Sequence, residues 1–203
     1  MSSTYKPFTP DDAAIVLVDH QPGVVAMMHS VPVETMTFNT AFLARLGEEL
    51  DIPLLITSTR EDEGVLGTTL PEIQQAAPRA YKNRIRRAGT MDAFLDPAFV
   101  EALKALGRKN LVMAGLTTDV CLWHSAFSAN EAGYTVHAIA DASGSSSELV
   151  DMVYYDRMRE LGIGVGSAMG TLLELYPNLS TPAGKRAEAV VHAQAHAMAA
   201  VLA

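Results

Sequence analysis

The feature that most constrains the fold is a run of six apolar residues, Ala13 to Val18, with no polar residue between them. A strand with one face in water alternates apolar and polar side chains, whereas a parallel strand covered on both faces is apolar throughout. The run ends at Asp19, so a carboxylate lies at the carboxyl end of the expected strand. A chain with such a strand needs helices on both faces of its sheet.

Further apolar runs alternate with helical patterns along the rest of the chain. This alternation predicts an α/β fold, a doubly wound six-stranded parallel sheet between two helical layers with right-handed crossovers. Of the strand orders that fit, 3-2-1-4-5-6 makes the first and fourth strands neighbours. The later strands are expected at IPLLITST, AYKNRI, NLVMAGL, YTVHAIAD and GIGVGSA, and the clearest helices at Glu34 to Leu50, LPEIQQAA and Pro97 to Leu106, the last capped by Asp96 and ended by Gly107.

The length of 203 residues fits one domain, residues 1–203, and we find no internal repeat or linker. The alanine-rich tail, about residues 182–203, follows Thr181, a good helix cap. We expect this tail to form one more helix that packs on the body or on another subunit.

The charge balance and the apolar pattern exclude several classes of partner. Fifteen Lys and Arg against 23 Asp and Glu give a net charge of −8, and the basic residues form no extended stripe, so we expect no nucleic acid. The apolar stretches are shorter than the ~20 residues of a membrane helix, so we expect no membrane span. One cysteine cannot form an internal disulfide, and MSSTYKPFTPDD has no secretory pattern. These features predict a cytoplasmic protein.

The only cysteine, Cys121, lies between the apolar run NLVMAGL and the amphipathic run LWHSAFSANEAG. A strand, turn and helix in this order place the thiol near a helix N-terminus, where backbone N–H groups and the helix dipole favour the thiolate. Cys121 is therefore a candidate nucleophile. The alternative is a buried cysteine that acts as a small apolar core residue.

A thiol nucleophile benefits from a nearby base and from a cation that holds the base. Asp19 also ends a strand and faces the same crevice as Cys121 if their strands are neighbours. Its alternative role is to cap the turn HQPG. Candidate cations come from YKNRIRRAG, although such charge runs are usually solvated: Lys82, Arg84, Arg86 and Arg87.

Three motifs occur in a familiar order: Asp19 in IVLVDHQ, a basic residue before AGTMDAF, and GLTTDVC followed by a helix. Together with ADASG and GTLLELY, they make residues 11–177 resemble the isochorismatase-like cysteine hydrolases, which include nicotinamidases, carbamoylsarcosine amidases and ureidoacrylate hydrolases. The resemblance implies a triad of Asp19, a basic residue and Cys121. It also implies attack on an amide carbonyl, loss of ammonia or an amine, and hydrolysis of a thioester.

The resemblance further implies a cis peptide between Leu116 and Thr117, and an oxyanion hole formed by the N–H groups of Thr117 and Cys121. The family's lysine position falls near Ala88, so we expect Arg87 to be the cation, with Lys82 as the alternative. This spacing resembles a branch of large-ring oligomers with a catalytic arginine and an undefined substrate. Because arginine does not exchange protons near neutral pH, Asp19 would carry all proton transfer.

Other polar and aromatic residues are weaker candidates. Gln21, Trp123 and His124 are expected to line the pocket, as are His20 and Phe127, and His124 is also a candidate for a cysteine-histidine dyad. The stretch TSTREDEGVLG lacks the histidine of metal-binding nicotinamidases, so we expect no metal and no cofactor. His192 and His196 have a metal-binding spacing but no third ligand.

Taken together, the residues and the resemblance predict a cofactor-independent hydrolase of a small amide, imide or carbamoyl compound. We expect a homo-oligomer, tetrameric or octameric. Two alternatives are a binding or scaffold protein with an inert thiol, and a vinyl-ether hydrolase like isochorismatase, which the cysteine disfavours. A serine hydrolase is less expected because SGSSSE lacks the GxSxG frame.

Overall fold

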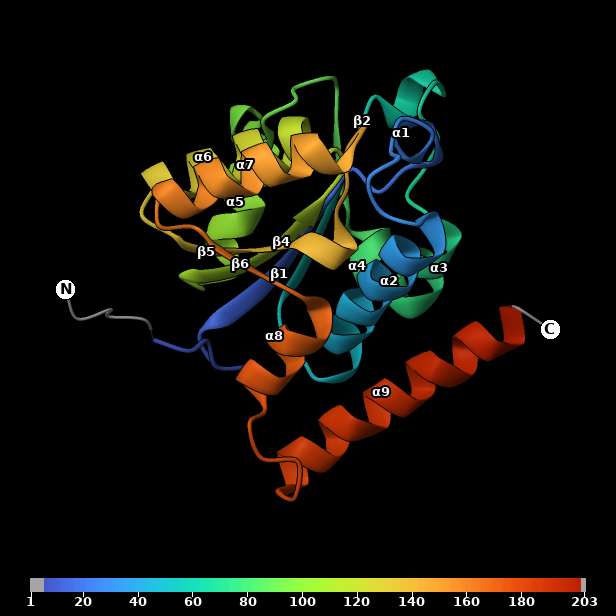
Figure 1. The fold of residues 1–203 in the computed structure, drawn as a ribbon, viewed down its shortest axis with the longest axis vertical. Coiled ribbons are helices and arrows are strands. Elements are labelled where there is room, and N and C mark those ends of the chain that lie inside the picture. Colours follow the sequence, from blue (N-terminus) through green and yellow to red (C-terminus); the bar gives the residue numbers. More distant parts are fainter. Residues whose placement is uncertain (1–5, 202–203) are drawn as a thin grey trace.

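Six parallel strands form one sheet in the order β3-β2-β1-β4-β5-β6, which confirms the predicted fold class and strand order (Figure 1). The computed structural model describes residues 6–201, so both ends of the expected domain, residues 1–5 and 202–203, lie outside the described residues. The last two of these also end the expected tail helix. The strands are β1 (Ala13–Val18), β2 (Leu54–Thr59), β3 (Ile85–Arg87), β4 (Asn110–Gly115), β5 (Thr135–Ile139) and β6 (Gly164–Gly166).

Helices cover both faces of this sheet (Figure 1). One layer contains α2 (Val33–Glu49), α3 (Pro71–Ala76), α4 (Pro78–Lys82) and α8 (Ala168–Leu175), and the other contains α5 (Pro97–Ala105), α6 (Trp123–Glu131) and α7 (Glu148–Glu160). A short helix, α1 (Pro22–Val25), follows β1, and α9 (Pro182–Val201) ends the described chain.

The central strand β1 explains why both faces need a helical layer. Its side chains alternate between two cores: Ile15 and Leu17 belong to the core under α2, and Ala14 and Val16 to the core under α6. Every residue of β1 is at most 1% exposed. The unbroken apolar run therefore follows from burial on both sides.

The register brings the carboxyl ends of the central strands to one edge of the sheet. Val18 at the end of β1 lies beside Thr57 of β2 and Gly115 of β4. Thr59 at the end of β2 lies beside Arg87 at the end of β3. Residues that follow these strands therefore share one crevice.

The expected strand at AYKNRI is wrong in its position. Its first residues continue the helix that Pro78 begins, α4, and the strand begins only at Ile85. β3 is a three-residue edge strand, paired only with β2. A strand this short carries no periodic signal, and the proline preset a helical turn before it.

The expected helix signals act at their predicted positions. Asp96 accepts hydrogen bonds from the N–H groups of Ala98 and Phe99, at 2.9 and 3.2 Å, and so caps α5. Gly107 follows α5 with a φ of +66°, the left-handed conformation that favours glycine. At α9 the Thr181 hydroxyl accepts from the Gly184 N–H at 3.0 Å.

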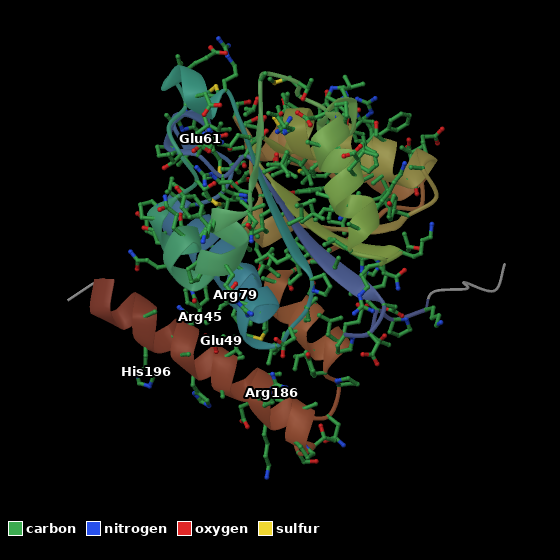
Figure 2. The ribbon with its side chains drawn as sticks, turned by 180° about the vertical axis from the view of Figure 1, so that it is seen from behind. Arg45, Glu49, Glu61, Arg79, Arg186 and His196 are labelled. Atoms are coloured by element: carbon green, nitrogen blue, oxygen red, sulfur yellow. The ribbon has the colours of Figure 1, made fainter. Side chains whose placement is uncertain are left out.

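The tail helix α9 packs on the outside of α2 (Figure 2). Gln194 is the main polar link, because it accepts from Arg45 Nε at 3.1 Å and donates to the Phe38 carbonyl at 3.1 Å. Ala187 and Val190 are buried in the same contact. The helix therefore extends the core of its own chain. Within residues 6–201, no helix has both the length and the apolar character needed to cross a membrane.

Candidate active site

Three elements that are far apart in sequence bring Asp19, Arg87 and Cys121 together at the carboxyl edge of the sheet. Asp19 follows β1 with a φ of +60°, and Arg87 is the last residue of β3. Cys121 lies in η3 (Thr118–Leu122), a π-helical turn between β4 and α6. The burial of all three side chains isolates the cluster from bulk water.

Asp19 and Arg87 form a fully buried ion pair. Arg87 Nη2 donates to both carboxylate oxygens of Asp19. The guanidinium is held in place by two further bonds, from Nε to Thr57 Oγ1 at 2.9 Å and from Nη1 to the Thr90 carbonyl. Burial raises the pKa of Asp19, and the charge and hydrogen bonds of Arg87 oppose that rise. Asp19 is thus a stronger base than a solvated carboxylate.

The thiol of Cys121 is only 4% exposed and lies beside the Asp19–Arg87 pair, whose charges act on its pKa. Burial raises the pKa of Cys121 well above its ordinary value, and the negative charge of Asp19 raises it further. The expectation of a thiolate favoured by the helix N-terminus is therefore wrong for the resting site, because burial and the negative charge of Asp19 raise the pKa of the thiol. The resting pair is a neutral thiol beside a carboxylate.

The turn before Cys121 is held by contacts from the segment after β5. The Thr118 N–H donates to the Gly144 carbonyl at 2.9 Å, and the Gly115 N–H donates to Ser143 Oγ at 3.0 Å. The peptide bond between Leu116 and Thr117 is cis. Thr117 and Cys121 line the same cavity, and the oxyanion hole expected from their N–H groups stays a prediction.

A cavity of about 410 Å³ opens above Cys121. This volume lies within the range of small-molecule sites. Most of its wall is apolar, with Cys121 at the wall and the Asp19–Arg87 pair outside the lining. Its lining residues are Val24, Met27, Leu66, Met91 and Val120, together with the polar Thr59, Arg60, Thr117, Asp119 and Ser146.

Gln21 does not line this cavity, contrary to expectation. Its buried side-chain amide instead joins the end of β2 to the loop at Gly67. It donates to the carbonyls of Thr59 and Gly67, at 3.0 and 2.6 Å, and accepts from the Thr59 N–H at 2.8 Å. Gln21 therefore holds the backbone of Thr59, which lines the cavity, without lining the cavity itself.

Trp123 and His124 are also wrong as lining residues. Trp123 is two residues after Cys121, so helical rotation places its side chain on the opposite side of the helix from the thiol. Trp123 packs edge-on against Tyr154 with ring centroids 5.6 Å apart, and Arg157 lies 4.3 Å over its ring. His124 is exposed to solvent and does not line the cavity. Neither aromatic residue contributes to the wall.

His20 and Phe127 lie outside the lining as well. His20 is buried, with Nε2 2.9 Å from the Ala142 carbonyl, and burial lowers its pKa to about 4. It is therefore neutral and structural. Phe127 is 38% exposed on the outer side of α6.

Among the candidate cations, the structure brings only Arg87 to Asp19. The other basic side chains of that segment have acidic partners or lie in solvent. Arg84 pairs with Glu61, Arg86 pairs with Asp62 at 2.7 Å, and Lys82 is exposed at the end of α4.

Sequence reasoning missed most of the cavity wall. Thr59 follows from the rule that identified Asp19, because it ends a strand beside β1. Asp119 lies two residues before Cys121 in the same motif. Met27, Leu66 and Met91 carry no local signal, because only the folded loops bring them to the cavity.

Within the described residues, no group of three or more His, Cys, Asp or Glu side chains is arranged to hold a metal ion. His192 and His196 are exposed on α9. Figure 2 shows His196 projecting away from the body of the molecule.

The chain resembles known proteins in its sequence. The model of the isochorismatase domain matches residues 13–169. The probable hydrolase YcaC of Escherichia coli is 32% identical over 176 residues, which cover 87% of this chain and 83% of that protein.

Two solved structures have the same fold over nearly the whole chain. YcaC from Pseudomonas aeruginosa, with hexane-2,5-diol and covalent acrylamide, superposes with a TM-score of 0.88 and 30% identity, covering 99% of this chain and 98% of the other. YcaC from Escherichia coli, described as an octameric hydrolase of unknown specificity, gives 0.85 and 30%, with 98% of each chain covered.

Proposed function

Because this chain belongs to the isochorismatase family, we propose that it is a cofactor-independent cysteine hydrolase that cleaves a C–N bond of a small amide, imide or carbamoyl compound. The observation that carries the proposal is the position of Cys121 at the wall of a small cavity, beside a buried Asp19 that Arg87 holds in place. A nucleophile, a base beside it and a group that orients the base are the parts of a covalent hydrolase.

The chemistry begins with proton transfer from the thiol to Asp19 as Sγ attacks the substrate carbonyl carbon. The new S–C bond gives a tetrahedral intermediate, whose oxyanion the N–H groups of Thr117 and Cys121 stabilise. As the C–N bond breaks, Asp19 returns the proton to the leaving nitrogen, which departs as ammonia or an amine. A thioester remains on Cys121.

Water then hydrolyses the thioester. Asp19 takes a proton from the attacking water, the S–C bond breaks, and the proton returns to Sγ as the carboxylic acid leaves. Asp19 serves both half-reactions, which suits a carboxylate whose pKa is raised by burial. Arg87 exchanges no proton, and its role is to orient Asp19 and balance its charge.

A solved relative supports a small compound with an amide group, since YcaC from Pseudomonas aeruginosa is described with covalent acrylamide. The size of the cavity, about 410 Å³, also suits a compound with few non-hydrogen atoms. The Escherichia coli relative is of unknown specificity, so the substrate class rests on the chemistry of the site.

Ammonia release from a panel of small primary amides, imides and carbamoyl compounds tests this function directly. The native chain should turn over at least one of them and, after a rapid acid quench, show an acyl adduct on Cys121 by intact mass. Cys121→Ser and Cys121→Ala should keep the circular dichroism spectrum and lose turnover. Retained activity in either variant would refute the nucleophilic role.

A second candidate is a binding protein on this fold with an inert thiol. The raised pKa of Cys121 is the observation that favours it. It predicts reversible ligand binding with no acyl adduct and equal affinity in Cys121→Ala. The third candidate function is a vinyl-ether hydrolase, which a separate assay of pyruvate release from isochorismate tests.

We also propose that the chain is a cytoplasmic homo-oligomer, tetrameric or octameric. The octameric state of the Escherichia coli relative supports this, as do exposed apolar side chains on α7: Leu149, Met152 and Val153 are 70%, 63% and 47% exposed. Native mass spectrometry should give a tetramer or an octamer. A monomer at micromolar concentration would contradict the assembly.

A further inference from the structure

Two charged side chains line the catalytic cavity, Arg60 and Asp119. They lie on different elements: Arg60 follows β2, and Asp119 belongs to η3, two residues before Cys121. The buried Asp19–Arg87 pair is neutral as a whole and lies outside the lining. The charge that a substrate meets in the cavity therefore depends on whether Arg60 and Asp119 have partners of their own.

Arg60 is neutralised by an acid three residues along the chain. Its Nε and Nη2 both donate to Glu63 Oε2, at 3.0 and 2.7 Å. The pair is the third of a series, because η1 (Glu61–Glu63) supplies one acid to each nearby arginine: Glu61 to Arg84, Asp62 to Arg86 and Glu63 to Arg60. The basic cluster that ends at Arg87 thus leaves no free cation beside the cavity within the described part of the chain.

Asp119 has no such compensation. Among residues 6–201, no Lys, Arg or His lies within ion-pair distance of its carboxylate, and no side chain or backbone group donates a hydrogen bond to it. The side chain is half-buried at the cavity wall. The rest of the wall is mainly apolar and lowers the local dielectric, which strengthens the field of an unpaired charge.

We propose that Asp119 determines specificity, selecting substrates that present an uncharged N–H donor or a cation and rejecting carboxylates. The inference rests on the proposed function and narrows its substrate to uncharged or cationic amides with a small hydrocarbon body. An amide N–H satisfies the free acceptor of Asp119, whereas an anion meets an unpaired negative charge and no free cation. Isochorismate, a dicarboxylate, should be rejected for the same reason.

The test compares two alkylating agents that differ in charge, iodoacetamide and iodoacetate. Cys121 is the only cysteine, so intact mass gives its alkylation rate with each reagent. The ratio of the iodoacetamide rate to the iodoacetate rate reports the electrostatic potential near the thiol, because a change in intrinsic thiol reactivity affects both reagents alike. The native chain should favour iodoacetamide more strongly than a free thiol in the same buffer does.

Asp119→Asn should lower this ratio by about three- to tenfold, the effect of one nearby charge at a partly solvated site. Asp156→Asn is the matched control, because it changes the chain's net charge equally at an exposed residue of α7 that pairs with Arg159. Its ratio should equal that of the native chain. Glu63→Gln frees Arg60 and should also lower the ratio, so the inference stays testable if Asp119→Asn fails to fold.

Equal ratios in Asp119→Asn and Asp156→Asn would overturn the inference. A native chain that iodoacetamide does not label would overturn it too, because an uncharged amide must be able to reach Cys121. The alkylation readout needs no turnover. A chain with the expected charge preference but no acyl adduct on any amide would refute the proposed function while leaving the charge selection in place.

Discussion

Replacing Arg87 with methionine removes the cation from a buried ion pair and leaves the Asp19 carboxylate without a partner. Both side chains are fully buried, so water does not replace the lost bonds. Breaking one partner of a buried pair costs about 3–5 kcal/mol. The change also frees Thr57 Oγ1 and the Thr90 carbonyl from their bonds to the guanidinium. Methionine keeps much of the apolar stem of the arginine side chain, so the loss of stability reports mainly the loss of the positive charge.

The double variant Asp19→Asn with Arg87→Met separates charge from packing. It leaves no buried charge, so its free energy of unfolding should exceed the additive expectation by at least about 1 kcal/mol. Urea unfolding at a fixed protein concentration, followed by the fluorescence of the single tryptophan, Trp123, measures each variant.

The pH dependence of the Arg87→Met penalty provides an internal check. Without the guanidinium, the pKa of Asp19 rises further above its unfolded value, because burial then acts unopposed. A group whose folded pKa is raised stabilises the fold at low pH and loses that contribution as the pH rises. The penalty should therefore be larger at about pH 7 than at about pH 5. Additive effects of Asp19→Asn and Arg87→Met on the free energy of unfolding, or a loss below about 1 kcal/mol in Arg87→Met, would refute the reasoning.

Two further predictions concern the residues around the site. Burial lowers the pKa of His20 to about 4 from its ordinary 6.5, so the free energy of unfolding should decrease as the pH falls from about 6.5 towards 4. His20→Gln should weaken this pH dependence, measured by urea unfolding. An unchanged pH dependence in the variant would contradict the prediction. A Cβ at Gly23 would lie 2.7 Å from Leu66 Cα, so Gly23→Ala should displace this cavity wall, cost about 1–3 kcal/mol and slow iodoacetamide labelling. Gly166→Ala, where a Cβ meets open space, should do neither.

The fold was largely predictable because buried parallel strands leave a direct trace in the sequence. An unbroken apolar run such as Ala13 to Val18 indicates helices on both faces, and the β1 side chains do alternate between two cores. The edge strand β3 was misplaced because three residues after a proline-initiated helix carry no period.

The position of the triad candidates was predictable for a topological reason. Asp19 and Cys121 follow strands that are neighbours in the sheet, and strand ends meet at one edge. Their catalytic roles stay predictions. Whether Arg87 or Lys82 meets Asp19 depends on where a short edge strand ends, which only the folded chain decides.

The lining residues and the thiol pKa were not predictable from local sequence. Trp123 and His124 are near Cys121 in sequence, but neither lines the cavity of the folded chain. The cavity wall comes instead from segments whose positions are fixed by tertiary contacts, such as the hydrogen bonds between Gln21 and Thr59. The raised pKa of Cys121 depends on burial and on Asp19, neither of which a helix-dipole argument includes.

The most direct test of the central claim, that Asp19 activates Cys121, is the pH dependence of Cys121 alkylation by iodoacetamide in the native chain and in Asp19→Asn. With the thiol pKa raised and Asp19 as its base, the native rate should reach a plateau once Asp19 is ionised and should not follow an ordinary titration near pH ~8.5. Asp19→Asn removes the base and should lose this plateau, so its rate should rise with pH along the titration of the thiol alone, whose pKa falls when the negative charge of Asp19 is removed. Superimposable profiles that follow an ordinary thiol titration in both proteins would contradict the account.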